Sequence, residues 1–192
     1  MGPATRAVAV ALLLLGASVG CSCSRDDDTD KSVPTPGPVV LIELRNGWSD
    51  PGTDPAAIAG ESARARAKGN PEVADVLLFY SDVSRAAGDV LSVVTTVDGR
   101  AALAVRRHSD TATPLDQAVA RVVAEAKKQG GVLTAAAVTF HAVPAWEVVH
   151  TGVPAGQRDV TYWFDRAGGR FTVEISGAAA DVTALADAVR VT

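Results

Sequence analysis

The side chains best suited to acid–base chemistry or metal binding in this 192-residue chain are three histidines, His108, His141 and His150. No two of them are four residues apart and none lies in an HExxH pattern, so no helix presents two imidazoles to one metal ion. A nucleophilic triad needs a serine on a sharp turn, and Ser109 and Asp110, beside His108, lie in no such motif. We therefore expect no catalytic residue, metal or cofactor. A hydrolase that uses one of the histidines is the alternative.

Aromatic side chains on the polar face of a strand can anchor a ligand or a partner. Alternation along residues 159–165 places Trp163 on the face opposite Val160, Tyr162 and Phe164. Three further side chains are candidates for binding: Trp48, Trp146 and His150. Two alternatives stay open, because a helix over the second face would make Trp163 part of the core, and Trp48 could close the edge of the core.

Three carboxylates are expected on strands and could form a cluster: Glu147, Asp165 and Glu174. Strand faces that contact solvent commonly carry such residues, so the cluster is only one interpretation. The chain has 18 basic and 22 acidic residues, a formal net charge of −4. That balance argues against a nucleic-acid-binding surface.

The first 20 residues have the layout of a signal peptide, with Arg6 before the apolar run 7–15 and small residues after it. The run is too short to span a membrane, which takes roughly 20 apolar residues. Ser18-Val19-Gly20-Cys21 resembles the bacterial lipobox, although that motif prefers leucine where Ser18 stands. The resemblance implies that Cys21 receives a diacylglyceryl group and becomes the first residue of a lipoprotein on the extracytoplasmic face of the cell membrane. Cys23 is a rival acceptor, and a metal-binding or disulfide-bonded pair of the two cysteines is the other reading.

Residues 21–38 are rich in Asp, Ser, Thr and Pro and have few apolar side chains, so we expect an acylated, disordered tether. Residues 39–192 have the length of one domain. Their patterns of apolar residues and turn signals predict the following elements: a strand at 39–45, helices at 54–68 and 70–88, a hairpin of 90–97 and 100–107 about Asp98-Gly99, a helix from Thr113-Pro114 to Gly130-Gly131, a strand pair of 132–140 and 145–151 about Val143-Pro144, a pair of 159–165 and 170–176, and a helix at 181–191. We expect an α+β domain, with an antiparallel sheet of about six or seven strands packed by helices.

This order of elements, with Gly47-Trp48 after the first strand and Pro144-Ala145 before the closing hairpin, resembles the LpqN-like lipoproteins of actinobacteria. The resemblance implies a PsbP-like fold and a non-enzymatic domain of the cell envelope. Such a domain binds an envelope protein, a lipid or a glycan. A passive structural or assembly factor without a ligand is a further possibility.

Overall fold

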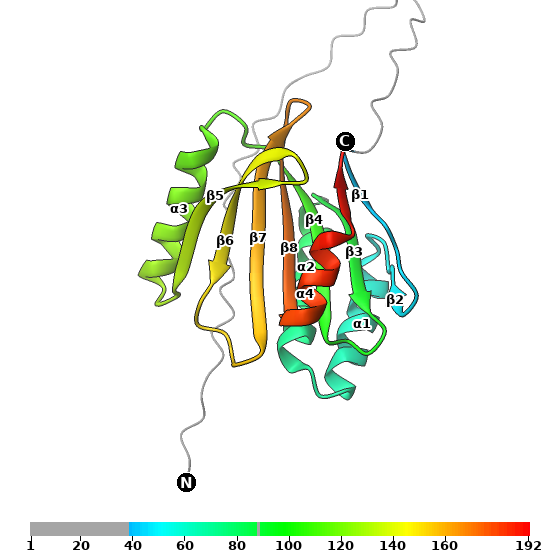
Figure 1. The fold of residues 1–192 in the computed structure, drawn as a ribbon. Coiled ribbons are helices and arrows are strands. Elements are labelled where there is room, and N and C mark those ends of the chain that lie inside the picture. Colours follow the sequence, from blue (N-terminus) through cyan, green and yellow to red (C-terminus); the bar gives the residue numbers. More distant parts are fainter. Residues whose placement is uncertain (1–38, 88) are drawn as a thin grey trace, which may run out of the picture.

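The computed structural model describes residues 39–87 and 89–192, and the predicted signal peptide, the tether and Cys21 lie outside them. Figure 1 shows the elements in chain order: β1 (Val40–Ile42), β2 (Trp48–Ser49), α1 (Pro55–Ala67), α2 (Pro71–Ala87), β3 (Val90–Thr96), β4 (Ala101–His108), α3 (Leu115–Lys128), β5 (Leu133–Phe140), β6 (Val143–His150), β7 (Gln157–Arg166), β8 (Gly169–Ala178), α4 (Ala179–Asp187) and β9 (Val189–Val191). Among these described helices, none is both long and apolar enough to cross a membrane.

One antiparallel sheet of seven strands organises the domain, in the order β2-β3-β4-β8-β7-β6-β5. A second sheet pairs β1 with β9, the first and last strands, so both ends of residues 39–192 are held together. The predicted α+β class and the antiparallel sheet packed by helices are confirmed.

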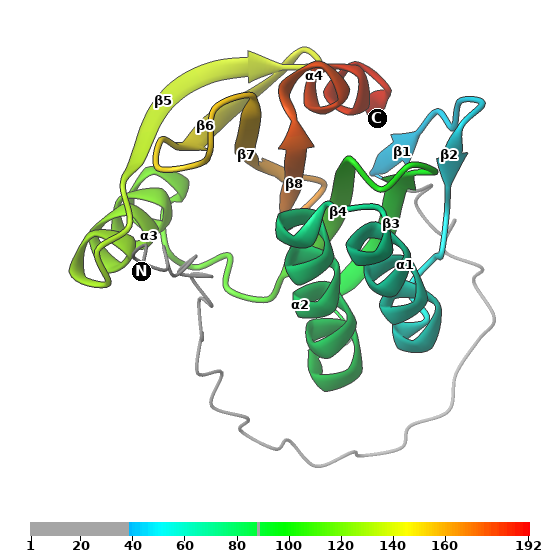
Figure 2. The same cartoon turned by 90° about the horizontal axis from the view of Figure 1, so that it is seen from below.

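Helices cover both faces of the large sheet, as Figure 2 shows. On one face, α1 and α2 lie over β3 and β4, while α3 lies over β5, β6 and β7 at the other end. On the opposite face, α4 packs on the sheet, and its Val182 and Leu185 join Val173 and Phe164 in the largest apolar cluster. The face that carries α1, α2 and α3 is called the three-helix face below.

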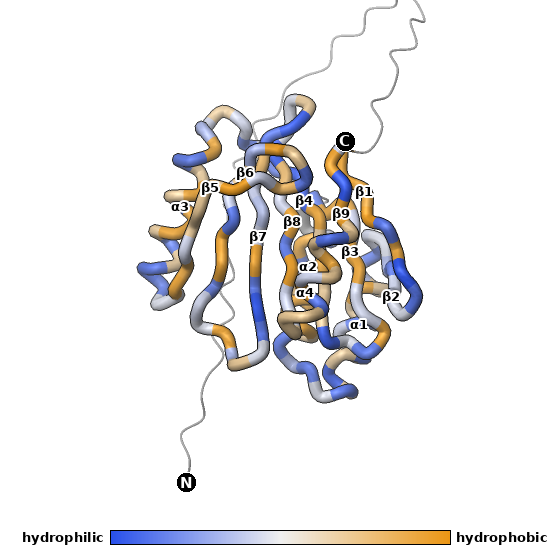
Figure 3. Tube along the Cα trace, viewed as in Figure 1, coloured by the Kyte–Doolittle hydropathy of each residue, from blue (hydrophilic) through white to orange (hydrophobic). Residues whose placement is uncertain are grey.

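Period-two alternation decides which side chains reach which face. In β7, Val160 and Phe164 join the apolar cluster under α4, whereas Trp163 points to the three-helix face and packs with α3. Figure 3 shows both apolar and hydrophilic positions along the strands. The predicted faces of β7 are therefore confirmed.

Local signals set the ends of the helices. The carboxylate of Asp54 accepts a hydrogen bond from the backbone N–H of Ala56 at 3.0 Å, and Pro55 follows as the first helical residue of α1. Helix α3 starts after Pro114, and the backbone N–H of Gly130 closes its last turn, as predicted.

Three expectations were wrong in detail. The turn between β5 and β6 is His141-Ala142, both at positive φ, and Val143 and Pro144 belong to β6. The last helix ends at Asp187, and residues 189–191 form β9, because their alternating valines complete the small sheet with β1. The first strand is shorter than the predicted 39–45, and Trp48, which follows it, begins a further strand, β2, which extends the large sheet beside β3.

Candidate functional site

A row of polar side chains crosses the three-helix face in the region between α2 and α3. We call it the polar strip, and its members are Tyr80 of α2, Arg106 and His108 of β4, His150 of β6, Asp159 of β7, and Thr172, Glu174 and Ser176 of β8. The register of the sheet brings them together, since Arg106 lies opposite Thr172 and Asp159 lies opposite both Ser176 and His150. Five members are partly open to solvent: Arg106, His108, His150, Asp159 and Glu174.

Glu174 is the centre of the strip. The Tyr80 hydroxyl donates to its Oε2 at 3.1 Å, and the Thr172 hydroxyl donates to its Oε1 at 2.9 Å. Arg106 adds an ion pair, with Nη1 3.5 Å from the same Oε1. The carboxylate is therefore held by one helix and two strands, which fixes its orientation before any ligand arrives.

The proton of His108 can be placed from this network. Nε2 of His108 lies 3.1 Å from the Thr172 oxygen. The hydroxyl of Thr172 has one proton, and it is donated to Glu174, so the Thr172 oxygen accepts from His108. Nε2 thus carries the proton of the neutral ring, and Nδ1 is the acceptor.

The pKa of His108 is lowered to about 4, mainly by burial and secondly by the nearby positive charge of Arg106. The imidazole is neutral at pH 7. Burial also raises the pKa of Tyr80 well above its ordinary value, and the negative charge of Glu174 acts in the same direction. Tyr80 is thus a fixed hydroxyl donor at all physiological pH values.

Arg106 links the strip to Asp89, the residue directly before β3. Its Nη2 donates to Oδ2 of Asp89 at 2.9 Å. Within the described residues, Arg106 Nε and Asp89 Oδ1 are buried atoms that have no hydrogen-bond partner. The three carboxylates Asp89, Asp159 and Glu174 outnumber the one guanidinium, so the region carries net negative charge.

At the other end of the strip, the Ser176 hydroxyl donates to Oδ1 of Asp159. Nδ1 of His150 lies 3.8 Å from Oδ2 of the same carboxylate. His150, a predicted candidate for binding, is thus a member of the strip.

Trp163 and Trp146 lie beside the strip rather than in it. Trp163 is 9% exposed and packs with Val119 of α3 and Val148 of β6, so it is part of the core, which is the alternative stated above. Trp146 is its partner across β6 and β7 and is half-buried against the same cluster. The two indoles form the floor under α3.

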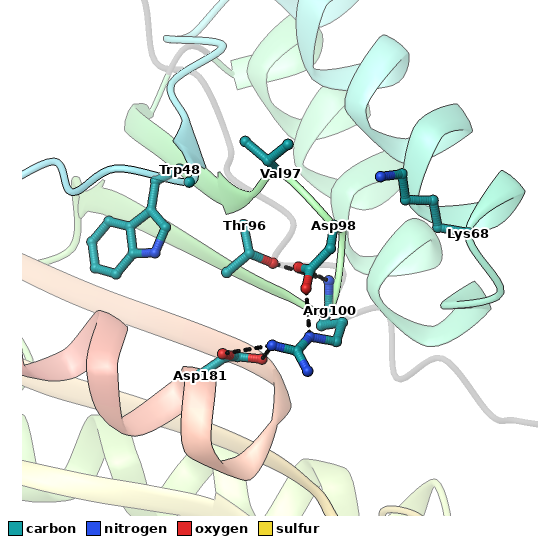
Figure 4. A pocket seen from close by; sticks show the side chains of 8 residues that line it. Trp48, Lys68, Thr96, Val97, Asp98, Arg100 and Asp181 are labelled. Carbon is teal, nitrogen blue, oxygen red and sulfur yellow. Dashed lines mark hydrogen bonds and ion pairs between the residues drawn. The ribbon is translucent and has the colours of Figure 1, made fainter.

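Trp48 lies away from the strip, in an open hollow of about 290 Å³ at the tip of the β3–β4 hairpin (Figure 4). Arg100 occupies the middle of this hollow, with Nε 2.6 Å from Asp98 Oδ2 and Nη2 3.3 Å from Asp181 Oδ2. Trp48 is partly buried against the apolar cluster under α4 and faces the guanidinium of Arg45 at 5.5 Å. Arg100 and Lys68, which both line the hollow, balance the charges of Asp98 and Asp181. The hollow therefore has less excess charge than the strip.

The remaining candidates lie apart from one another. Glu147 is on the α4 face, where it accepts hydrogen bonds from Tyr162 and Arg158 at 3.0 Å each. Asp165 instead pairs with Arg170, so the carboxylate cluster with Glu174 is not formed. His141 lies in the β5–β6 turn, with Nε2 2.9 Å from the Ala186 oxygen. In residues 39–87 and 89–192 no group of three His, Cys, Asp or Glu side chains is placed to hold a metal ion.

Sequence reasoning found His150 and Glu174 but not the network that contains them. Tyr80 could not be found in this way, because its hydroxyl meets Glu174, 94 residues away in the chain, only through the fold. Thr172 could have been found, because it alternates with apolar residues of the predicted strand 170–176, whereas His108 lies just beyond the predicted strand 100–107.

Comparisons with known proteins place the chain by its fold alone. No protein-family model matches it, and no curated protein is similar to it at a significant level. The solution structure of CyanoP, the PsbP protein of Synechocystis sp. PCC 6803, is similar over 80% of this chain and 87% of that chain, with 13% identity and a TM-score of 0.46. The crystal structure of PA94, a protein of unknown function from Pseudomonas aeruginosa, matches 44% of this chain with 20% identity and a TM-score of 0.35, and the match spans 62% of that protein. A PsbP protein, the kind of structure that the sequence resemblance implied, is thus among the structural neighbours of this α+β chain.

Proposed function

We propose that this protein is a lipid-anchored lipoprotein on the extracytoplasmic face of the cell membrane, where it acts as a non-enzymatic binding module of the cell envelope. The polar strip is its binding surface. The observation that carries the proposal is the network around Glu174, which fixes polar groups that are still partly open to solvent. Preorganised polar groups favour binding because little side-chain entropy is lost when the ligand arrives.

The direction of the hydrogen bonds in the strip favours binding over catalysis. A histidine that activates a hydroxyl must accept its proton, whereas His108 donates to the Thr172 oxygen. Thr172 is also completely buried, and its own proton is engaged by Glu174. With its pKa lowered to about 4, His108 is a weak base at neutral pH.

The chemistry of the strip indicates what it binds. Asp159 and Glu174 present carboxylate oxygens, and His108 presents an accepting ring nitrogen. These groups match a ligand with several hydroxyl or ammonium donors. A glycan or the polar head of an envelope lipid has these donors, as does a basic segment of an envelope protein.

The first experiment is native mass spectrometry of residues 39–192, secreted without the anchor and searched for a co-purified small molecule. These residues form a closed unit, since the first and last strands pair with one another. We expect a bound molecule with hydroxyl or amine groups. A bare mass together with no envelope protein crosslinked in cells would contradict the proposal.

Two matched substitutions locate the site. Tyr80 and Tyr162 each donate to a glutamate, at 3.1 Å and 3.0 Å, but on opposite faces of the sheet. We expect Glu174→Gln in the strip to lower the retention of the ligand about tenfold, because a charge-assisted contact is lost. Glu147→Gln on the α4 face is the control and leaves retention unchanged.

The anchor is tested separately. Cys21→Ala is expected to release an unprocessed or soluble species from the membrane fraction, while Cys23→Ala leaves the protein in place. The reverse pattern would move the acylation site to Cys23, and release by neither substitution would refute the anchor.

The finer identity that we propose is an LpqN-like lipoprotein, on the order of elements with Gly47-Trp48 and Pro144-Ala145. A hydrolase is the alternative that the experiments must exclude. Simultaneous replacement of His108, His141 and His150 by alanine abolishes any histidine-dependent hydrolysis of an envelope ester or amide. If purified protein shows such an activity and the triple variant lacks it, the non-enzymatic proposal is wrong.

A further inference from the structure

Strand β5 ends the seven-stranded sheet, and no described strand pairs with its outer edge. It is eight residues long, pairs with β6 without a bulge, and forms the outermost strand at one end of the sheet in Figure 2. The opposite edge, β2, has only two residues. The long free edge of the sheet is therefore β5.

The turn determines which backbone groups of β5 face outward. A two-residue turn with positive φ at both positions, here His141 and Ala142, joins a hydrogen-bonded pair, Phe140 and Val143. Every second residue back along β5 then bonds to β6, which agrees with the bond from the Thr151 N–H to the Val132 oxygen. The outward-facing N–H and C=O groups consequently belong to Leu133, Ala135, Ala137 and Thr139.

Strand β5 lacks the features that normally keep an edge from pairing. Its sequence, LTAAAVTF, has no charged residue and no proline, and Figure 3 shows no strongly hydrophilic position along it. The side chains from Thr134 to Ala137 are exposed, and Val132 before the strand is 57% exposed. Small uncharged side chains leave the backbone accessible to another strand.

We propose that β5 pairs with β5 of a second copy of this chain, so that two sheets join into one across a two-fold axis. Antiparallel pairing of a strand with itself closes as a dimer with two-fold symmetry, in which both copies make the same contacts. The register centred on Ala136 sets Ala135 against Ala137 of the other copy and Leu133 against Thr139. It is the register that uses all four outward-facing residues of both copies, which gives about eight backbone hydrogen bonds.

The side chains suit this register. On the three-helix face the neighbours are alanine with alanine and leucine with threonine. On the other face Ala136 meets its own copy, and Thr134 meets Val138. No charged residue meets a like charge, and β-branched and small residues pack well between strands. These properties favour a second copy over a charged partner.

The size of the contact sets its strength. One strand pair buries less than the roughly 1,600 Å² of a stable interface, so we expect a dimer that forms with rising concentration. If the proposed lipid anchor is correct, two copies held on one membrane meet at a higher effective concentration. Self-association itself does not rest on the anchor or on the polar strip.

A cysteine at the axis tests the register directly, because residues 39–192 contain no cysteine. In the proposed register, Ala136 and its copy form a non-hydrogen-bonded pair with Cα atoms about 4.5 Å apart, within the range that a disulfide spans. We expect Ala136→Cys to form a disulfide-linked dimer at least about fivefold faster than Ala124→Cys, a variant with an exposed cysteine on α3. Equal rates would overturn the register.

Charge exchange tests the pairing without a covalent bond. In sedimentation experiments between about 10 μM and about 1 mM, we expect the unmodified domain to self-associate. Ala136→Lys and Ala136→Glu each abolish association, because like charges meet at the axis, and an equal mixture of the two restores it. The pair Ala124→Lys and Ala124→Glu is the control and associates like the unmodified domain.

Three results would overturn the proposal: a monomer at every concentration, association that Ala136→Lys does not affect, or a mixture that stays monomeric. Capture of a different envelope protein at β5 by a chain that is itself monomeric would also contradict it. None of these results bears on ligand binding at the strip, so the two proposals fail independently.

Discussion

The imidazole of His108 is stacked on the indole of Trp163, with ring centroids 4.8 Å apart and planes inclined by 22°. Nε2 of the imidazole bonds to Thr172 within the polar strip, while the flat face of the ring lies on Trp163, which belongs to the core under α3. This single side chain therefore connects the apolar cluster packed against α3 with the hydrogen-bond network of Glu174. A charge on it would disturb both.

Acid should unfold the protein partly through His108. Because its folded pKa is about 4 and its unfolded pKa about 6.5, the unfolded chain binds more protons between these values. This contribution to stability is complete above pH 6.5 and is lost as the pH falls toward 4, and it amounts to about 3 kcal/mol. His108→Gln keeps a donor to Thr172 and removes the titration. We expect its free energy of unfolding, measured in urea, to vary less with pH than that of the parent protein between pH 6.5 and 4. His141 and His150 are present in both proteins and cancel, so equal slopes would refute the assignment.

The hydroxyl of Tyr80 should stabilise the fold by satisfying Glu174. Tyr80→Phe removes a buried donor and leaves Oε2 of Glu174 without it, so we expect the free energy of unfolding to fall by about 1–3 kcal/mol. Tyr162→Phe removes an equivalent donor from Glu147, but Arg158 still donates to the same oxygen. Thermal denaturation of the two variants should therefore show the larger loss for Tyr80→Phe. A larger loss for Tyr162→Phe would contradict the central place of Glu174.

Much of the fold could be predicted from the sequence because short-range signals agree with the tertiary structure. Proline and aspartate mark the starts of α1 and α3, and Asp98-Gly99 joins β3 to β4. The β5–β6 turn could not be placed in this way. The pattern suggested a turn at Pro144, but this proline is tolerated inside β6 because the position opposite Thr139 needs no N–H bond to β5.

The candidate site was harder to predict because its parts come from separate elements. Alternation assigns Thr172 and Glu174 to a polar face, but only the packing of α2 shows that Tyr80 completes their network. The same alternation identified Trp163 as a candidate anchor, and only the position of α3 shows that it is buried. Which polar face a helix leaves open is a property of the tertiary structure.

Gly99 should tolerate alanine much less than Gly168 does. Both lie in hairpin turns at nearly the same positive φ, 70° and 72°, so alanine is strained by about 1 kcal/mol at either position. A Cβ at Gly99 would lie 2.7 Å from Cα of Ala65 in α1, whereas a Cβ at Gly168 meets nothing within 4 Å. We expect Gly99→Ala to lower the free energy of unfolding by about 1–3 kcal/mol more than Gly168→Ala. Equal losses in chemical denaturation would show that the hairpin tip does not pack tightly on α1.

Arg170 should hold α3 in place through the connection that precedes this helix. The side chain is 2% exposed, and it donates to both carboxylate oxygens of Asp165, at 2.8 and 3.0 Å. Its remaining donors reach the backbone oxygens of Asp110 and Thr113 in the connection from β4 to α3, at 3.2 and 2.7 Å. Arg170→Met leaves those oxygens and Asp165 without their donors, and we expect a loss of about 2–4 kcal/mol.

The position of that loss distinguishes a clamp on α3 from general destabilisation. With Arg170→Met, amide hydrogen exchange should become faster in α3 and in the connection 109–114 than in α1, which is packed at the other end of the sheet. Arg85→Met, which removes an exposed ion pair with Asp82 at 3.6 Å, is the control and should change stability by less than about 0.5 kcal/mol. Uniform acceleration of exchange in α1 and α3 would mean that Arg170 stabilises the domain as a whole. Selective acceleration would show that a single guanidinium positions the helix that borders the polar strip.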